Sequence, residues 1–85
     1  MRNDLPNVNQ LKWRCRRGIK EVELLLIPYF DTFFITSSEK NKWLFVDLLE
    51  EDDVVLFEWF TQRSTPNIPE IAQLVDTIIH RKQPN

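Results

Sequence analysis

The sequence predicts an all-α fold, a small single-domain bundle of about five short helices. Apolar residues recur at helical spacing along most of the chain. Neither an Asn-Gly nor an Asp-Gly hairpin signal is present, and no apolar–polar alternation is sustained. The length of 85 residues leaves no room for a second core. The hydrophobic fraction of 42% is ample for one packed core. We therefore expect one domain that spans residues 1–85.

The first helix is expected to open at Asn7. Asn7 with Gln10 three residues later resembles an N-cap arrangement. One stripe of this helix then carries Val8, Leu11 and Cys15.

A central helix is expected after Ile19. Its apolar girdle is wide enough to pack on several sides, and includes Ile19, Val22, Leu24, Leu25, Leu26, Ile27, Tyr29, Phe30 and Phe33. Pro28 removes a backbone donor, so we expect this helix to kink or end near Ile27.

The remaining three helices follow from capping and charge signals. Thr36, Ser37 and Ser38 form a cluster of cap residues, and Thr36 with Glu39 matches a capping box. The helix that follows presents Phe45, Leu48 and Leu49. The acidic run 50–53 suits the first turn of a fourth helix, where the helix dipole favours carboxylates. That helix carries Leu56, Phe57, Trp59 and Phe60. The last helix starts within residues 67–70, buries Ile71, Leu74, Val75, Ile78 and Ile79, and ends in the basic run His80-Arg81-Lys82.

Charge is unevenly distributed along the chain. Residues 1–20 hold six of the eleven Lys and Arg residues, whereas residues 21–58 hold ten of the thirteen Asp and Glu residues. We expect a basic patch and an acidic patch, which suit a protein partner. A protein that binds nucleic acid normally carries a dominant basic surface. The net charge of −2 therefore argues against a nucleic-acid partner.

Few residues could support catalysis. His80 sits in a basic helix C-terminus, which favours a surface role over that of a catalytic base. Cys15 lies among arginines, which favour a thiolate, but it also shares an apolar stripe with Leu11, and the buried reading is preferred. The acidic run 50–53 lacks the ligand spacing of a calcium loop, so no metal site is expected and a solvated helix start or a docking surface for a basic partner remains. We therefore expect no enzymatic activity.

Gly18 is the only glycine, and it follows two arginines. One interpretation is a left-handed residue that ends the first helix. The other is a notch that a partner's backbone can approach, flanked by Arg17 and Glu21. Both can hold together.

The segment Trp13-Arg14-Cys15-Arg16-Arg17-Gly18-Ile19-Lys20-Glu21 resembles the Arg-Gly-x-x-Glu signature of the succinate dehydrogenase flavin-assembly factors. The resemblance continues through residues 26–30 and 48–53, then 56–59 and the last helix. Val54-Val55 departs from the more polar start that the family shows after the paired aspartates.

The resemblance implies one flavin-assembly-factor domain that promotes covalent attachment of FAD to the flavoprotein subunit of succinate dehydrogenase, and of fumarate reductase. The FAD belongs to the client, so the factor has no cofactor of its own. The signature carries over to Arg17, Gly18 and Glu21. The full set of candidate partner-binding residues is Arg14, Arg16, Arg17, Gly18, Glu21, Asp52, Asp53 and Trp59.

A second hypothesis is a regulatory interaction module, antitoxin-like, with no role in flavin chemistry. The chain shows neither a signal peptide nor an apolar run long enough to cross a membrane. We expect a cytoplasmic monomer without membrane insertion.

Overall fold

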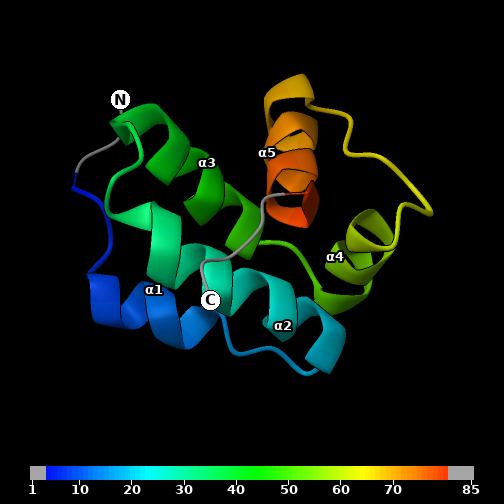
Figure 1. Cartoon of the computed structure of the whole chain (residues 1–85), viewed down its shortest axis with the longest axis horizontal. Coiled ribbons are helices and arrows are strands. Elements are labelled where there is room, and N and C mark those ends of the chain that lie inside the picture. Colours follow the sequence, from blue (N-terminus) through cyan, green and yellow to red (C-terminus); the bar gives the residue numbers. More distant parts are fainter. Residues whose placement is uncertain (1–3, 81–85) are drawn as a thin grey trace.

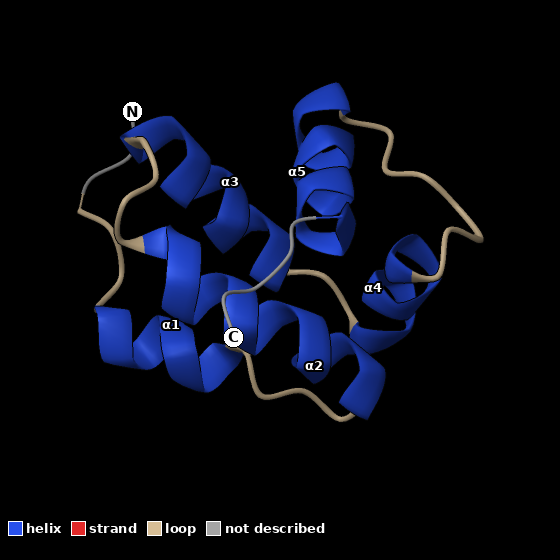
Figure 2. Cartoon of the chain, in the orientation of Figure 1, coloured by secondary structure: helices blue, strands red, loops and turns tan. Residues whose placement is uncertain are grey.

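The computed structural model describes residues 4–80 and contains five α-helices and one π-helical segment, with no strand in that range. The helices are α1 (Val8–Arg14), α2 (Lys20–Tyr29), α3 (Glu39–Leu49), α4 (Asp53–Phe60) and α5 (Pro69–His80), and the π-helix η1 (Phe30–Phe34) continues α2 (Figures 1 and 2). The all-α prediction is confirmed. Arg81 and Lys82, expected to extend the basic end of the last helix, lie outside the described residues.

α2 occupies the centre of the bundle. It contacts both α4 and α5, while α3 also packs against α5. Its inward side buries Val22, Leu26 and Tyr29, and η1 adds Phe30 and Phe34. The aromatic rings gather around Phe45 of α3, whose centroid lies 5.6 to 5.8 Å from the rings of Tyr29, Phe30 and Phe34. This cluster joins the central helix to α3.

The sequence predicts a kink or an end of this helix near Ile27; α2 ends at Tyr29, but the backbone remains helical beyond it. α2 runs through Pro28 to Tyr29 and passes directly into η1. Proline in a helix interior costs about 3 kcal/mol or more. Burial of Leu26, Tyr29, Phe30 and Phe34 on both sides of it contributes about 1.5–3 kcal/mol for each side chain, which outweighs that cost.

The start of α3 differs from the expected capping box. Ser38, not Thr36, is the N-cap: its backbone is extended and its hydroxyl accepts a hydrogen bond from the Asn41 N–H at 3.1 Å. The hydroxyls of Thr36 and Ser37 instead donate to the Phe33 carbonyl, at 3.2 and 2.7 Å. Both hydroxyls therefore complete the end of η1.

The first helix begins as expected. Asn7 is its N-cap, and the Asn7 side chain accepts from the Asn9 N–H at 2.7 Å. Leu11 and Cys15 are completely buried, whereas Val8 is exposed. α5 likewise buries Ile71, Leu74, Val75 and Ile78, as its periodicity predicts, whereas Ile79, expected on the same face, is only partly buried.

Candidate functional site

The acidic run 50–53 does not form the first turn of one helix. Glu50 is the C-cap of α3, Asp52 is the N-cap of α4, and only Asp53 lies in the first turn of α4. The run forms the sharp connection between α3 and α4, so its backbone cannot be helical throughout. The expectation of four carboxylates at a helix start is therefore wrong for Glu50 and Glu51.

This acidic connection lies against the basic connection between α1 and α2. Arg14 Nη2 pairs with Glu50 Oε1 at 2.9 Å, and Arg17 Nε pairs with Asp53 Oδ1 at 2.6 Å. Basic and acidic segments that the sequence suggested as separate surface patches therefore meet at this place. These two ion pairs neutralise part of the charge of the expected basic and acidic patches.

Arg17 is the centre of this contact. Besides Asp53, its guanidinium donates to the carbonyl oxygens of Arg14 at 3.1 Å, Leu49 at 3.0 Å and Glu51. Only 14% of the Arg17 side chain is exposed. A planar, forked cation can satisfy several acceptors at once, which a lysine cannot do. Arg17 thus fastens the α1–α2 connection to the end of α3 and the start of α4.

Asp53 completes the contact from the other side. Its Oδ2 accepts a 2.8 Å hydrogen bond from the backbone N–H of Gly18, while its Oδ1 accepts from Arg17. The Arg17 hydrogen bond, followed by the Gly18 N–H, holds the pKa of Asp53 below its usual value. We call the contact among Arg17, Gly18 and Asp53 the Arg17–Asp53 clamp.

Gly18 lies in the connection between α1 and α2, and its φ is not positive. The interpretation of Gly18 as a left-handed helix terminator is therefore wrong; α1 already ends with Cys15 as its right-handed C-cap. A Cβ at position 18 would meet a single neighbour within 4 Å, Asp53 Oδ2 at 3.1 Å. The close approach to Gly18 inside the molecule is thus made by a carboxylate, and its outer side is open space.

The remaining candidate residues are placed around the clamp or apart from it. Glu21 lies exposed in the first turn of α2, and Arg16 is exposed in the connection before it. Asp52 is exposed at the start of α4 and makes no side-chain capping bond. Trp59 is half-buried and lines a groove with Leu44 and Ile68, which the residues of the α1–α2 connection do not line.

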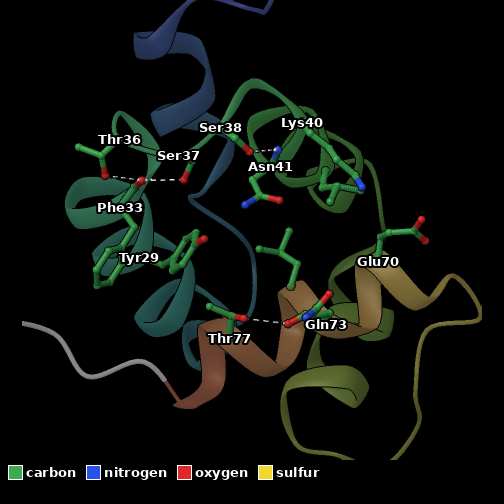
Figure 3. A pocket seen from close by; sticks show the side chains of 12 residues that line it. Tyr29, Phe33, Thr36, Ser37, Ser38, Lys40, Asn41, Glu70, Gln73 and Thr77 are labelled. Carbon is green, nitrogen blue, oxygen red and sulfur yellow. Dashed lines mark hydrogen bonds between the residues drawn. The ribbon is translucent and has the colours of Figure 1, made fainter.

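A polar pocket of about 470 Å³ lies between the end of α2, η1, α3 and α5 (Figure 3). It contains none of the candidate partner-binding residues. The hydroxyls of Thr36 and Ser37 donate to a carbonyl of η1, and Thr77 donates to the Gln73 carbonyl at 2.9 Å. These three hydroxyls are engaged by the protein backbone, and the polar side chains of Lys40, Asn41, Glu70 and Gln73 line the same pocket.

Cys15 and His80, the residues that the sequence raised as candidates for catalysis, lie at the ends of different helices, α1 and α5. Cys15 is buried, and burial, followed by the nearby Asp31 charge, raises its pKa to about 12. A thiol in that environment is not a nucleophile at neutral pH. His80 is 61% exposed and lies 3.0 Å from Asp76 Oδ1. Within residues 4–80, no group of three or more His, Cys, Asp or Glu side chains is placed to hold a metal ion.

No helix among the described residues is both long and apolar enough to cross a membrane.

Trp13 is a residue that the sequence reasoning missed: 72% of it is exposed on α1. The helical spacing could have predicted this exposure, since Leu11 and Cys15 face the core and a residue midway between them points away from it.

Comparison with known proteins places the chain. Residues 9–82 match the family described as flavinator of succinate dehydrogenase. The chain is similar to the FAD assembly factor SdhE of Shewanella oneidensis, with 36% identity over 95% of this chain and 99% of that protein. It is also similar to the factors of the same name from Pseudomonas putida, with 36% identity over 91% and 92% of the two chains, and from Pectobacterium atrosepticum, with 30% identity over 94% and 91%. The chain therefore belongs to the flavinator family of succinate dehydrogenase.

Proposed function

We propose that the protein is an assembly factor that promotes covalent attachment of FAD to the flavoprotein subunit of succinate dehydrogenase, with the flavoprotein of fumarate reductase as a second client. Family membership over residues 9–82 and relatives that carry the name FAD assembly factor support this proposal. The role requires a surface that holds another polypeptide, and it requires no nucleophile of the factor's own.

The observation that carries the proposal is the contrast within the signature itself. Arg17 is engaged by the clamp, while Gly18 and Glu21 next to it are exposed. We infer that Arg17 and Asp53 fix the shape of the α1–α2 connection, and that Gly18 and Glu21 contact the client. A connection that is already rigid loses little entropy on binding.

The client's backbone would approach the open side of Gly18, where a side chain would otherwise lie. The carboxylate of Glu21 would accept a charge-assisted hydrogen bond from the client. By binding one arrangement of the client's domains, the factor would raise the fraction of client molecules in which a client histidine and the flavin are placed to react. The bond-forming chemistry would belong to the client and its FAD.

The test is covalent flavinylation in a purified system. The apo-flavoprotein subunit is incubated with FAD, with and without the chain, and covalent flavin is read by fluorescence on a denaturing gel. We expect the chain to raise both the rate and the final extent of flavin attachment. Equal attachment with and without the chain would contradict the proposal and would favour a regulatory interaction module without a role in flavin chemistry.

A further inference from the structure

An exposed tryptophan adjoins the signature. Trp13 of α1 is 72% exposed, whereas Leu11 and Cys15 on the opposite side of the same helix are completely buried. A tryptophan carries about 150–250 Å² of surface and is one of the side chains that most reward burial. Its exposure at this position leaves a large apolar group in water beside the α1–α2 connection.

Arg16 lies against this ring. Its guanidinium carbon is 5.8 Å from the centroid of the Trp13 ring, within the range of a cation–π contact. Among the described residues, the Arg16 side chain makes neither an ion pair nor a hydrogen bond, in contrast to Arg14 and Arg17, which are both paired with acids. The N–H groups of Arg16 therefore remain available to an external carboxylate.

We propose that Trp13 and Arg16 form one recognition unit for a carboxylate-rimmed apolar pocket on the flavoprotein client. The indole ring would enter the pocket while the guanidinium pairs with an Asp or Glu at its edge. This inference rests on the proposed function, and it adds the chemistry of the client surface that lies next to the Gly18 contact.

Three features favour this occupant. Tryptophan and arginine are the side chains most often found as energetic anchors of protein interfaces. The cation–π contact favours the arrangement in which the guanidinium lies over the ring, so less conformational entropy is lost on binding. The positive charge of Arg16 is complementary to an acidic partner, and the unit is continuous along the chain with the connection that presents Gly18.

The probe is the purified apo-flavoprotein subunit, titrated with Trp13→Ala and Arg16→Glu variants of the full chain. We expect each variant to bind at least about 10-fold more weakly than wild type. The double variant should lose less than the product of the two single effects, because each change removes part of one unit. Trp13→Phe should retain most of the affinity.

The chain offers matched controls away from α1. Ile68→Ala removes an exposed apolar side chain from the connection between α4 and α5. This connection lies at the right of Figure 1, whereas α1 lies at the lower left. Arg63→Glu reverses the charge at a residue with a similar cation–π contact, since the Arg63 guanidinium carbon lies 5.7 Å from the Phe57 ring centroid. Both controls should bind the client as the wild type does, and all variants should keep the wild-type circular dichroism spectrum.

The outcomes separate this inference from the proposed function. If Trp13→Ala and Arg16→Glu bind like wild type while Glu21→Ala binds more weakly, the recognition unit is wrong and the client interaction stands. If the wild-type chain does not bind the subunit, both fail. If the two variants lose affinity for free FAD but none for the subunit, the pair contacts flavin and the inference is overturned.

Discussion

Arg17 and Asp53, which lie 36 residues apart in the chain, are joined by a 2.6 Å hydrogen bond between Arg17 Nε and Asp53 Oδ1. The second oxygen of Asp53 accepts from the Gly18 N–H at 2.8 Å. One carboxylate thus holds two consecutive residues of the signature. The arginine of the signature is engaged within the fold, whereas the glycine and the glutamate of the signature are exposed.

Replacement of Arg17 by lysine should destabilise the protein. Lysine keeps the charge but cannot reach Asp53 and the carbonyls of Leu49 and Glu51 together, so partly buried acceptors lose their donors. We expect Arg17→Lys to lower the free energy of unfolding by about 2–4 kcal/mol, measured by urea denaturation. The matched control Arg16→Lys changes an exposed side chain and should cost about 0.5 kcal/mol or less. Equal stability of the two variants would contradict the clamp.

Stability should depend on the ionisation of Asp53. Because the Arg17 and Gly18 hydrogen bonds lower its pKa in the folded protein, its contribution is present at neutral pH and is lost as the pH falls through that lowered pKa. We expect Asp53→Asn to cost about 1–3 kcal/mol at pH 7. The difference from wild type should shrink as the pH is lowered below about 4. Asp52→Asn, at a side chain without a capping bond, should show neither effect, and a gap of constant size in Asp53→Asn would argue against the clamp.

Substitutions at Gly18 should separate folding from docking. Because φ of Gly18 is not positive, residues that keep the backbone N–H fit there, and a Cβ requires a shift of a few tenths of an ångström in Asp53 Oδ2, 3.1 Å away. Gly18→Ala and Gly18→Arg should therefore both fold, within about 1 kcal/mol of wild type by thermal unfolding. Only the arginine side chain is large enough to block a client backbone, so only Gly18→Arg should abolish client flavinylation. Parallel loss of stability and flavinylation in both variants would show that Gly18 serves the clamp alone.

The helices could be predicted from the sequence because apolar spacing reports the face that each helix buries. Leu11 and Cys15, and likewise Ile71, Leu74, Val75 and Ile78, lie in the core where periodicity places them. The boundaries could not all be predicted. The continuation through Pro28 depends on aromatic packing with Phe45, and the choice of Ser38 over Thr36 as N-cap depends on how η1 ends.

The sequence could identify the segment that contains the candidate site, but not how its residues are arranged in space. The order of residues 13–21 identified the signature, and its resemblance to the flavin-assembly factors identified the family. Nothing local to the sequence shows that the basic and acidic runs meet, because the Arg14–Glu50 and Arg17–Asp53 pairs form only when α3 and α4 fold back on the first two helices. The division between a structural Arg17 and an exposed Glu21 is a tertiary property.

The central claim is that the exposed surface of the signature binds another polypeptide, and Glu21 tests it most directly. The affinity of the purified apo-flavoprotein subunit is measured by titration calorimetry for the wild type, for Glu21→Ala, and for Glu23→Ala as a control two residues along α2. We expect Glu21→Ala to weaken binding by about 1–3 kcal/mol, roughly 5- to 150-fold, while Glu23→Ala binds as the wild type does. Equal affinity of the Glu21→Ala variant and the wild type would contradict the account.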